Sequence, residues 1–252
     1  MSVQIRAMWS RHSARVPRTP AATHPAGSLS SAGQMEYCSS WFTTTMYTVP
    51  TSSPIASLFP PEVVGVLAPI DDTDSPYPEE REAVAGAGER RRREFLTGRA
   101  CAHAALAALG RDAGPVAVGP DRRPVWPPGV VGSIAHAGAW AGAVVARAED
   151  VRAVGFDLEP LEPPLTPDVE RLVGIAGDPA APYRSKVAFS AKECVYKALF
   201  PATGRPFDFG DVTVDLDLPA GRFSARVAGV MGDALEGRVV VDHGYVFTGL
   251  TA

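Results

Sequence analysis

Apolar residues recur with the period of a strand in some segments of the chain and with the period of a helix in others. Two long segments have helical character: residues 78–109, which open with a proline followed by acids and end before Gly110, and residues 183–200. Shorter segments of strand character surround them. The predicted strands cover residues 62–70, 130–136, 140–147, 151–158, 212–218, 222–227, 238–241 and 245–250, and a short helix covers residues 166–175.

A long helix followed by strands occurs twice along the chain. No residue-level repeat accompanies this order, so the likeness of the two parts lies in their elements alone. The sequence predicts an α+β fold of two similar halves with pseudo-twofold symmetry, each a long helix packed on a small, mainly antiparallel sheet. We expect residues 61–150 to form the first half and residues 151–252 the second.

The first 60 residues differ in composition from the rest. They are rich in Ser, Thr and Pro, hold several arginines and only one acid, Glu36, and show no lasting apolar period. Such a segment has too few apolar side chains to offset the entropy lost on ordering, so we expect a disordered extension over residues 1–60. Its basic start has the composition of an organelle transit peptide, although a plain tail or an overlong reading of the gene explains it better.

Composition excludes several classes of protein. With 252 residues, 46% of them hydrophobic and 21% charged, the chain has the make-up of a folded globular protein. Its net charge of −4 argues against a general nucleic-acid binder, and no apolar run approaches the ~18 residues of a membrane span. Cys38, Cys101 and Cys194 are too widely spaced for a disulfide framework or a zinc site, so we expect a cytoplasmic protein.

Two acids stand at the end of the strand predicted over residues 151–158. Residues two apart on a strand face the same side, so Asp157 and Glu159 point one way while Phe156 and Leu158 point the other. Neighbouring carboxylates repel each other unless a cation or a shared proton relieves them, and Mg²⁺ takes such oxygen ligands together with substrate phosphates. Taken alone, the pair fits a solvated strand end more often than a metal site.

The second long helix carries Ser190, Glu193 and Lys197 on one face, at spacings of three and four residues. Glu193 could supply a third carboxylate for a metal ion, with Lys197 one turn further along to meet phosphate charge. By itself, however, the motif fits an ordinary surface Glu–Lys pair, which stabilises a helix only weakly.

The first long helix holds four consecutive arginines, residues 90–93, followed by Arg99. Arg91, Phe95 and Arg99 recur every four residues, so the two guanidiniums lie near one face, where they could grip a phosphate. At least two other arginines of the run fit a solvated helix face.

Ser133 and His136 lie beside the turn predicted at Gly138. A Ser–His pair can indicate a hydrolase, but the chain has no G-x-S-x-G motif, so nucleophilic serine catalysis is poorly supported.

The order and spacing of these signals are more specific than any signal alone. Arg91-x7-Arg99 is followed by Pro124-Val125-Trp126-Pro127-x-Gly129, by Gly132-Ser133-Ile134-Ala135-His136, by Gly155-Phe156-Asp157-Leu158-Glu159, and by Phe189-Ser190-Ala191-Lys192-Glu193-x3-Lys197. Over residues 61–252 this series resembles the 4'-phosphopantetheinyl transferases of the monomeric, two-halved type, which serve siderophore, nonribosomal peptide and polyketide synthases.

The resemblance implies an activity, a metal and a partner. Enzymes of this family move the phosphopantetheine arm of coenzyme A onto a serine of an apo carrier protein with Mg²⁺, and release adenosine 3',5'-bisphosphate. It also implies a role for each matching residue: Asp157, Glu159 and Glu193 would hold Mg²⁺, Glu193 would be the base for the serine and Lys197 would be catalytic, while Arg91, Arg99, Ser133, His136 and Lys197 would bind coenzyme A. Ala135 replaces a Thr or Ser of relatives. Arg122 lies in a stretch where relatives often have Gly or Lys, and it could supply the positive charge there as a further coenzyme A-binding residue.

Two other classes of function remain open on the residues alone. A Mg²⁺-dependent enzyme acting on another nucleotide would use the same acids, but it would not explain the Pro-Val-Trp-Pro and Gly-Ser-x-x-His segments. A non-catalytic scaffold that binds coenzyme A or a carrier protein would need no metal-binding set. The product distinguishes the three: a carrier protein heavier by one pantetheine arm, free phosphate, or neither.

Overall fold

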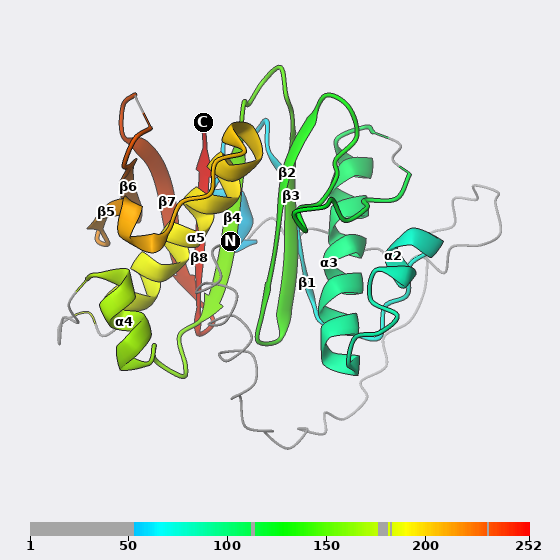
Figure 1. Ribbon diagram of the computed structural model, residues 1–252, viewed down its shortest axis with the longest axis horizontal. Coiled ribbons are helices and arrows are strands. Elements are labelled where there is room, and N and C mark those ends of the chain that lie inside the picture. The colour runs from blue at the N-terminus through cyan, green and yellow to red at the C-terminus, as the bar shows by residue number, and fades with distance from the viewer. Residues whose placement is uncertain (1–52, 112–113, 176–180, 182, 231) are drawn as a thin grey trace, which may run out of the picture.

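The computed structural model describes residues 53–111, 114–175, 181, 183–230 and 232–252. Within these ranges two antiparallel sheets each pack against a helix of 20 residues (Figure 1). The predicted α+β class is confirmed, although one sheet has three strands and the other five. The disorder expected of the N-terminal extension falls mostly on residues 1–52, which lie outside the described residues.

The elements follow one another along the chain in this order: η1 (Pro54–Ser57), β1 (Val64–Pro69), α2 (Pro78–Glu82), α3 (Glu89–Ala108), β2 (Val130–Ala137), β3 (Trp140–Arg147), β4 (Val154–Pro160), α4 (Pro167–Val173), α5 (Arg184–Thr203), η2 (Phe209–Asp211), β5 (Val212–Asp217), β6 (Arg222–Val227), β7 (Leu235–Asp242) and β8 (Tyr245–Thr251). Among the helices of the described residues, none combines the length and hydropathy of a bilayer-spanning segment.

The first sheet has the strand order β1-β3-β2, and α3 packs against it. Small and apolar residues of α3, among them Ala102, Ala105 and Leu106, are fully buried against Val66 and Val145 of the sheet. The arginines of α3 gather in its first turn, residues 90–93, ahead of these buried residues, and Arg99 is itself buried.

The single helix predicted over residues 78–109 is wrong. The structure has two helices there, α2 and α3, separated by residues 83–88. Gly86 and Gly88 lie in this gap, and Gly88 adopts an extended conformation (φ −63°, ψ 157°) at the start of α3. Glycine lowers helix stability by about 1 kcal/mol relative to alanine, so two glycines this close together favour a break.

The second sheet has the order β4-β8-β7-β6-β5, and α5 packs on it over β4 and β8. Gly155 makes the close approach of helix and strand possible, because a Cβ at this position would overlap the carbonyl oxygen of Cys194. Asp157 follows two residues later on the same face of β4, so the carboxylate also points at α5.

The two halves meet where β2 lies beside β4 (Figure 1). The hydroxyl of Ser133 on β2 joins them: it accepts a hydrogen bond from the Phe156 N–H at 3.1 Å and donates one to the Phe156 carbonyl at 3.3 Å. The side chains of Phe156 and Leu158 point away from α5 into a core shared by both halves, as the strand alternation predicts.

Ordered structure begins earlier than the predicted boundary near Pro61. Ile55, Leu58 and Phe59 are buried in the shared core, with Phe59 against the ring of Phe156 at 6.4 Å between centroids. The Ser- and Pro-rich composition of this segment predicted disorder. Its three apolar side chains are nevertheless enough to hold a short turn against the junction of the halves.

Candidate active site

Asp157 lies at the centre of the acidic part of the site. Its side chain is buried, and two residues of α5 donate hydrogen bonds to it: Ser190 Oγ to Oδ2 at 2.7 Å and Lys197 Nζ to Oδ1 at 2.6 Å. The helical spacing predicted Ser190 and Lys197 on one face, and both contact the same carboxylate. The strand and the helix are therefore held together through an ion pair that water reaches only poorly.

Glu159 and Glu193 flank this pair. Burial, followed by the negative charge of Asp157, raises the pKa of Glu193 to about 7 and moves the pKa of Glu159 upward for the same two reasons. Burial alone would lower the pKa of Lys197, but the charges of Asp157 and Glu193 outweigh it and raise that pKa. The site thus gathers three carboxyl groups and one lysine, and Glu193 is poised to gain or lose a proton near neutral pH.

A second group of charged residues joins α3 to β2. Arg91 Nη1 lies 2.7 Å from His136 Nε2, and the guanidinium groups of Arg91 and Arg99 lie 5.9 Å and 4.3 Å from the centre of the Phe95 ring between them. Arg99 is buried and its Nε has no hydrogen-bond partner among the described residues. An unpartnered buried donor of this kind suits an anionic ligand.

His136 is electrically coupled to both groups. Burial is the largest cause that lowers its pKa to about 3, and the charges of Arg91 and Lys197 come next. The ring is therefore neutral, and Lys197 acts on His136 as well as on Asp157 and Glu193. Lys197 is thus the residue that links the cationic and the acidic groups.

A cleft of about 350 Å³ opens between the halves beside Lys197. Its walls are the loop before β2, the strand β2 itself and the C-terminal part of α5. Tyr196 and Phe200 give it an apolar side, and Trp126 closes it from the loop, where its indole N–H donates to the Gly132 carbonyl at 3.0 Å. Such a concave, largely apolar space with a few charged groups is typical of a ligand site between two structural units.

The loop before β2 places Arg122 and Arg123 differently. Arg122 has a left-handed backbone (φ 69°) and lies close enough to help lower the pKa of Arg91, after burial. Arg123 lines the cleft, where its guanidinium packs 4.9 Å from the Phe200 ring and donates to the Phe200 carbonyl at 3.3 Å. The sequence offered no signal to choose Arg123, because its partner Phe200 is 77 residues away.

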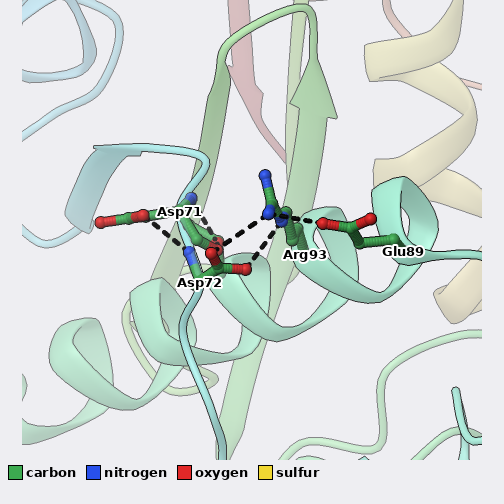
Figure 2. A network of polar contacts seen from close by, with 5 residues as sticks. Asp71, Asp72, Glu89 and Arg93 are labelled. Carbon is green, nitrogen blue, oxygen red and sulfur yellow. Dashed lines mark hydrogen bonds and ion pairs between the residues drawn. The ribbon is translucent and has the colours of Figure 1, made fainter.

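Arg93, a further arginine of the run on α3, has structural partners. Figure 2 shows Arg93 between Asp72, at 2.7 Å, and Glu89, at 2.6 Å. Asp72 belongs to the loop after β1, and its neighbour Asp71 is hydrogen-bonded to Thr97 of α3 at 3.3 Å. This network fixes the start of α3 against the sheet and so orients the turn that carries Arg91.

The acids have the chemistry of a magnesium site without forming a closed cage. Among the described residues, no three Asp, Glu, His or Cys side chains are grouped closely enough to enclose an ion as they stand. The charge of Asp157 nevertheless raises the pKa of both Glu159 and Glu193, and a divalent cation that prefers oxygen ligands would relieve this repulsion. The donor set therefore fits Mg²⁺.

A two-halved α+β protein that gathers cationic side chains and carboxylates around Lys197, beside a cleft between the halves, has the features of a site for an anionic ligand. Comparison with known proteins names the family. Residues 79–146 match the family model of the 4'-phosphopantetheinyl transferase N-terminal domain. The chain is 39% identical over 216 residues to the 4'-phosphopantetheinyl transferase Svp of Streptomyces mobaraensis. The aligned region covers 78% of this chain and 88% of Svp.

Two further relatives agree. The 4'-phosphopantetheinyl transferase PptT of Mycobacterium tuberculosis is 37% identical over 194 residues, covering 70% of this chain and 86% of PptT. Enterobactin synthase component D of Salmonella typhi is 37% identical over 137 residues, covering 50% of this chain and 56% of that protein. The chain belongs to the 4'-phosphopantetheinyl transferase family and is a transferase, which confirms the resemblance seen in the sequence.

Proposed function

We propose that the protein transfers the 4'-phosphopantetheine group of coenzyme A to a serine of an apo carrier protein with Mg²⁺, and releases adenosine 3',5'-bisphosphate. The observation that carries this proposal is the position of Lys197. It lines the cleft, pairs with Asp157 and acts on His136. A ligand with phosphates at two places along its length, as in coenzyme A, would meet the cationic group with one and the acidic group with the other.

Arg91, Arg99 and His136 would bind the nucleotide end of coenzyme A, including its 3'-phosphate. Two guanidiniums on one helix face, one of them with an unpartnered Nε, give the donors that a phosphate needs. This contact is remote from the reacting phosphorus, so it contributes to binding rather than to the chemical step. Ser133 and Arg122 would support the same end, although the Ser133 hydroxyl is hydrogen-bonded to Phe156.

The reaction would take place beside Glu193 and Lys197. The serine oxygen of the carrier protein attacks the phosphorus next to the pantetheine arm, and the bond from that phosphorus to the oxygen of the adenosine-side phosphate breaks. Glu193, with a pKa near neutrality, accepts the serine proton directly or through a water. Lys197 stabilises negative charge on the phosphate oxygens, so positioning and charge supply the catalysis.

Asp157, Glu159 and Glu193 would hold Mg²⁺. When bound, the ion neutralises charge on the pyrophosphate. Its ligands come from β4 and α5, the two elements that Gly155 allows to approach closely. The nucleotide-binding residues would then come from the predicted first half, residues 61–150, and the metal-binding acids from the predicted second half, residues 151–252.

The relatives suggest the setting in which the enzyme works. Since one of them is an enterobactin synthase component, we place the partner among the carrier domains of siderophore, nonribosomal peptide or polyketide synthases, the last two of which make antibiotics. We expect a cytoplasmic monomer, because the site is built from both halves of one chain and Cys101 and Cys194 are buried free thiols.

Intact mass spectrometry of a panel of apo carrier proteins tests the proposal. Incubation with the enzyme, coenzyme A and Mg²⁺ should add one phosphopantetheine arm to at least one carrier protein. Glu193→Gln should lower kcat by about a hundredfold or more, because it removes the base and a metal ligand. Glu62→Gln, at an exposed position before β1, is the control that should leave the rate unchanged. Full transfer with Mg²⁺ chelated, or by Glu193→Gln, would contradict the mechanism.

A further inference from the structure

Glu94 is a buried carboxylate of α3 that the proposed reaction does not use. Only 8% of its side chain is exposed, although it lies among basic residues. Its Oε1 accepts a hydrogen bond from Arg90 Nε at 2.8 Å, while its Oε2 lies 3.9 Å from Arg91 Nη1 and 3.5 Å from His136 Nδ1. Glu94 thus faces two of the side chains assigned to the nucleotide end of coenzyme A.

The contacts of His136 fix which ring nitrogen carries the proton. The guanidinium of Arg91 can only donate hydrogen bonds, so Nε2, at 2.7 Å from Arg91 Nη1, must accept one. A neutral imidazole with an accepting Nε2 has its proton on Nδ1, which is the nitrogen that faces Glu94. Glu94 therefore selects the ring orientation and the tautomer, as carboxylates beside metal-binding histidines do.

In this tautomer His136 cannot donate a hydrogen bond to a phosphate through Nε2. A lone pair on Nε2 repels a phosphate oxygen, whereas an N–H there would donate to it. Arg91 is 41% exposed, so its guanidinium can turn from the histidine to the ligand and free Nε2 for a proton. With both ring nitrogens protonated, His136 would donate to the phosphate through Nε2 and to Glu94 through Nδ1.

The charged groups around His136 determine whether its ring is protonated. Arg90, Arg91 and Arg99 of α3 and Lys197 of α5 all oppose protonation of the ring, and burial opposes it further. Glu94 favours it, and so does a phosphate monoester, which carries close to two negative charges above pH 7. The ring is therefore neutral without the ligand, and a bound phosphate would supply negative charge that favours its protonation.

We propose that Glu94 is a positioning residue that holds His136 through Nδ1, so that binding of the 3'-phosphate of coenzyme A is accompanied by uptake of one proton from solvent at Nε2. The inference rests on the proposed function, because it takes coenzyme A as the ligand. It assigns to this site a proton-linked preference for coenzyme A over the same molecule without its 3'-phosphate.

Calorimetry with the whole protein tests this without any variant. Coenzyme A and dephospho-coenzyme A, which lacks the 3'-phosphate, are titrated at pH 8 in two buffers of different ionisation enthalpy, with Mg²⁺ chelated. The buffer dependence of the heat gives the protons taken up. We expect more protons to be taken up with coenzyme A than with dephospho-coenzyme A. Any uptake by the acidic group cancels in this comparison, because both ligands carry the pyrophosphate.

Variants then test whether the extra proton depends on Glu94 and His136. Glu94→Gln should abolish the extra proton and weaken coenzyme A binding about tenfold, with dephospho-coenzyme A bound within about twofold of the unmodified protein. Glu94→Asp should restore part of both effects. Glu82→Gln, at an exposed position of α2, is the matched control and should change neither. If Glu94→Gln does not fold, His136→Gln carries the test and should likewise abolish the extra proton.

The outcomes separate this inference from the proposed function. Equal proton uptake for the two ligands, or an extra proton that survives in Glu94→Gln or His136→Gln, would overturn the inference while leaving the transferase assignment intact. Failure of the unmodified protein to bind coenzyme A even with Mg²⁺ present would count against the proposed function and would remove the inference with it.

Discussion

Replacing Glu193 by glutamine should make the protein more stable at alkaline pH while removing its activity. Glu193 is buried on α5 beside Asp157, and burial together with that neighbouring charge raises its pKa to about 7. Glutamine keeps the size and most of the hydrogen-bonding capacity of a protonated glutamate but carries no charge. The substitution therefore isolates the free energy of holding this one carboxylate ionised inside the fold.

The sign and size follow from the difference between the folded and unfolded pKa. Below about pH 4.5 Glu193 is protonated in both states, so its ionisation costs nothing. As the pH rises towards 7 the unfolded chain releases the proton while the folded protein retains it, and stability falls. Above pH 7 the loss is complete and amounts to about 3 kcal/mol, since each pH unit between 4.5 and 7 contributes about 1.4 kcal/mol.

Urea unfolding at several pH values between 4.5 and 8.5, with divalent cations chelated, measures this directly. The free energy of unfolding of Glu193→Gln minus that of the unmodified protein should rise by about 3 kcal/mol across this range. The difference between the two proteins removes the contribution of titrating groups that do not interact with Glu193. Glu159, whose pKa the charge of Glu193 also raises, adds to the difference in the same direction. Glu62→Gln, at an exposed position, should stay within about 0.5 kcal/mol of the unmodified protein at every pH.

A difference that does not change with pH would refute the account of Glu193 as a carboxyl with a raised pKa. A variant that becomes relatively less stable as the pH rises would refute it more strongly, because it would mean that the ionised form is favoured in the fold. Mg²⁺ should then reduce the advantage of the variant, since the ion would bind the unmodified acids more tightly than the variant.

Three further predictions concern binding and the junction of the halves. Arg99→Ala should raise KM for coenzyme A about tenfold with little change in kcat in a steady-state transfer assay, because its contact is remote from the reacting phosphorus; a collapsed kcat at unchanged KM would reject this. Phe59→Ala should lower the free energy of unfolding by about 3 kcal/mol in urea titrations, because the ring is buried in the shared core. Gly155→Ala should lower it by at least about 2 kcal/mol and reduce activity, because the new Cβ would overlap the Cys194 carbonyl and push α5 from β4.

The parts of the site that lie on regular elements could be predicted from short-range patterns. Strand alternation predicted Asp157 on one face of β4 and Phe156 on the other. In the structure Asp157 faces α5 and Phe156 lies in the shared core. Helical spacing put Ser190 and Lys197 together, and both donate to Asp157. In these cases the period of the backbone alone decides which side chains share a face, so no knowledge of the tertiary fold was needed.

Features decided by tertiary packing could not be predicted in this way. Glu94 after Arg90 is indistinguishable in sequence from an exposed ion pair one turn apart, and only the placement of β2 against α3 buries it beside His136. Arg123 joins the cleft because α5 brings Phe200 to it. The break before α3 was visible in Gly86 and Gly88, but the helical signal on either side outweighed it.

Two cations of this site, Lys197 and Arg91, each have a carboxylate nearby that the substrate must displace or share. Lys197 is paired with Asp157, and Arg91 lies near Glu94. A buried charge left unpaired costs several kcal/mol, so these carboxylates stabilise the protein before any ligand arrives. They also weaken binding, because a phosphate gains only the difference between its own contacts and those it replaces. A carboxylate that keeps another partner after its cation turns to the phosphate lowers the cost of binding coenzyme A. For Glu94 this remaining partner is His136.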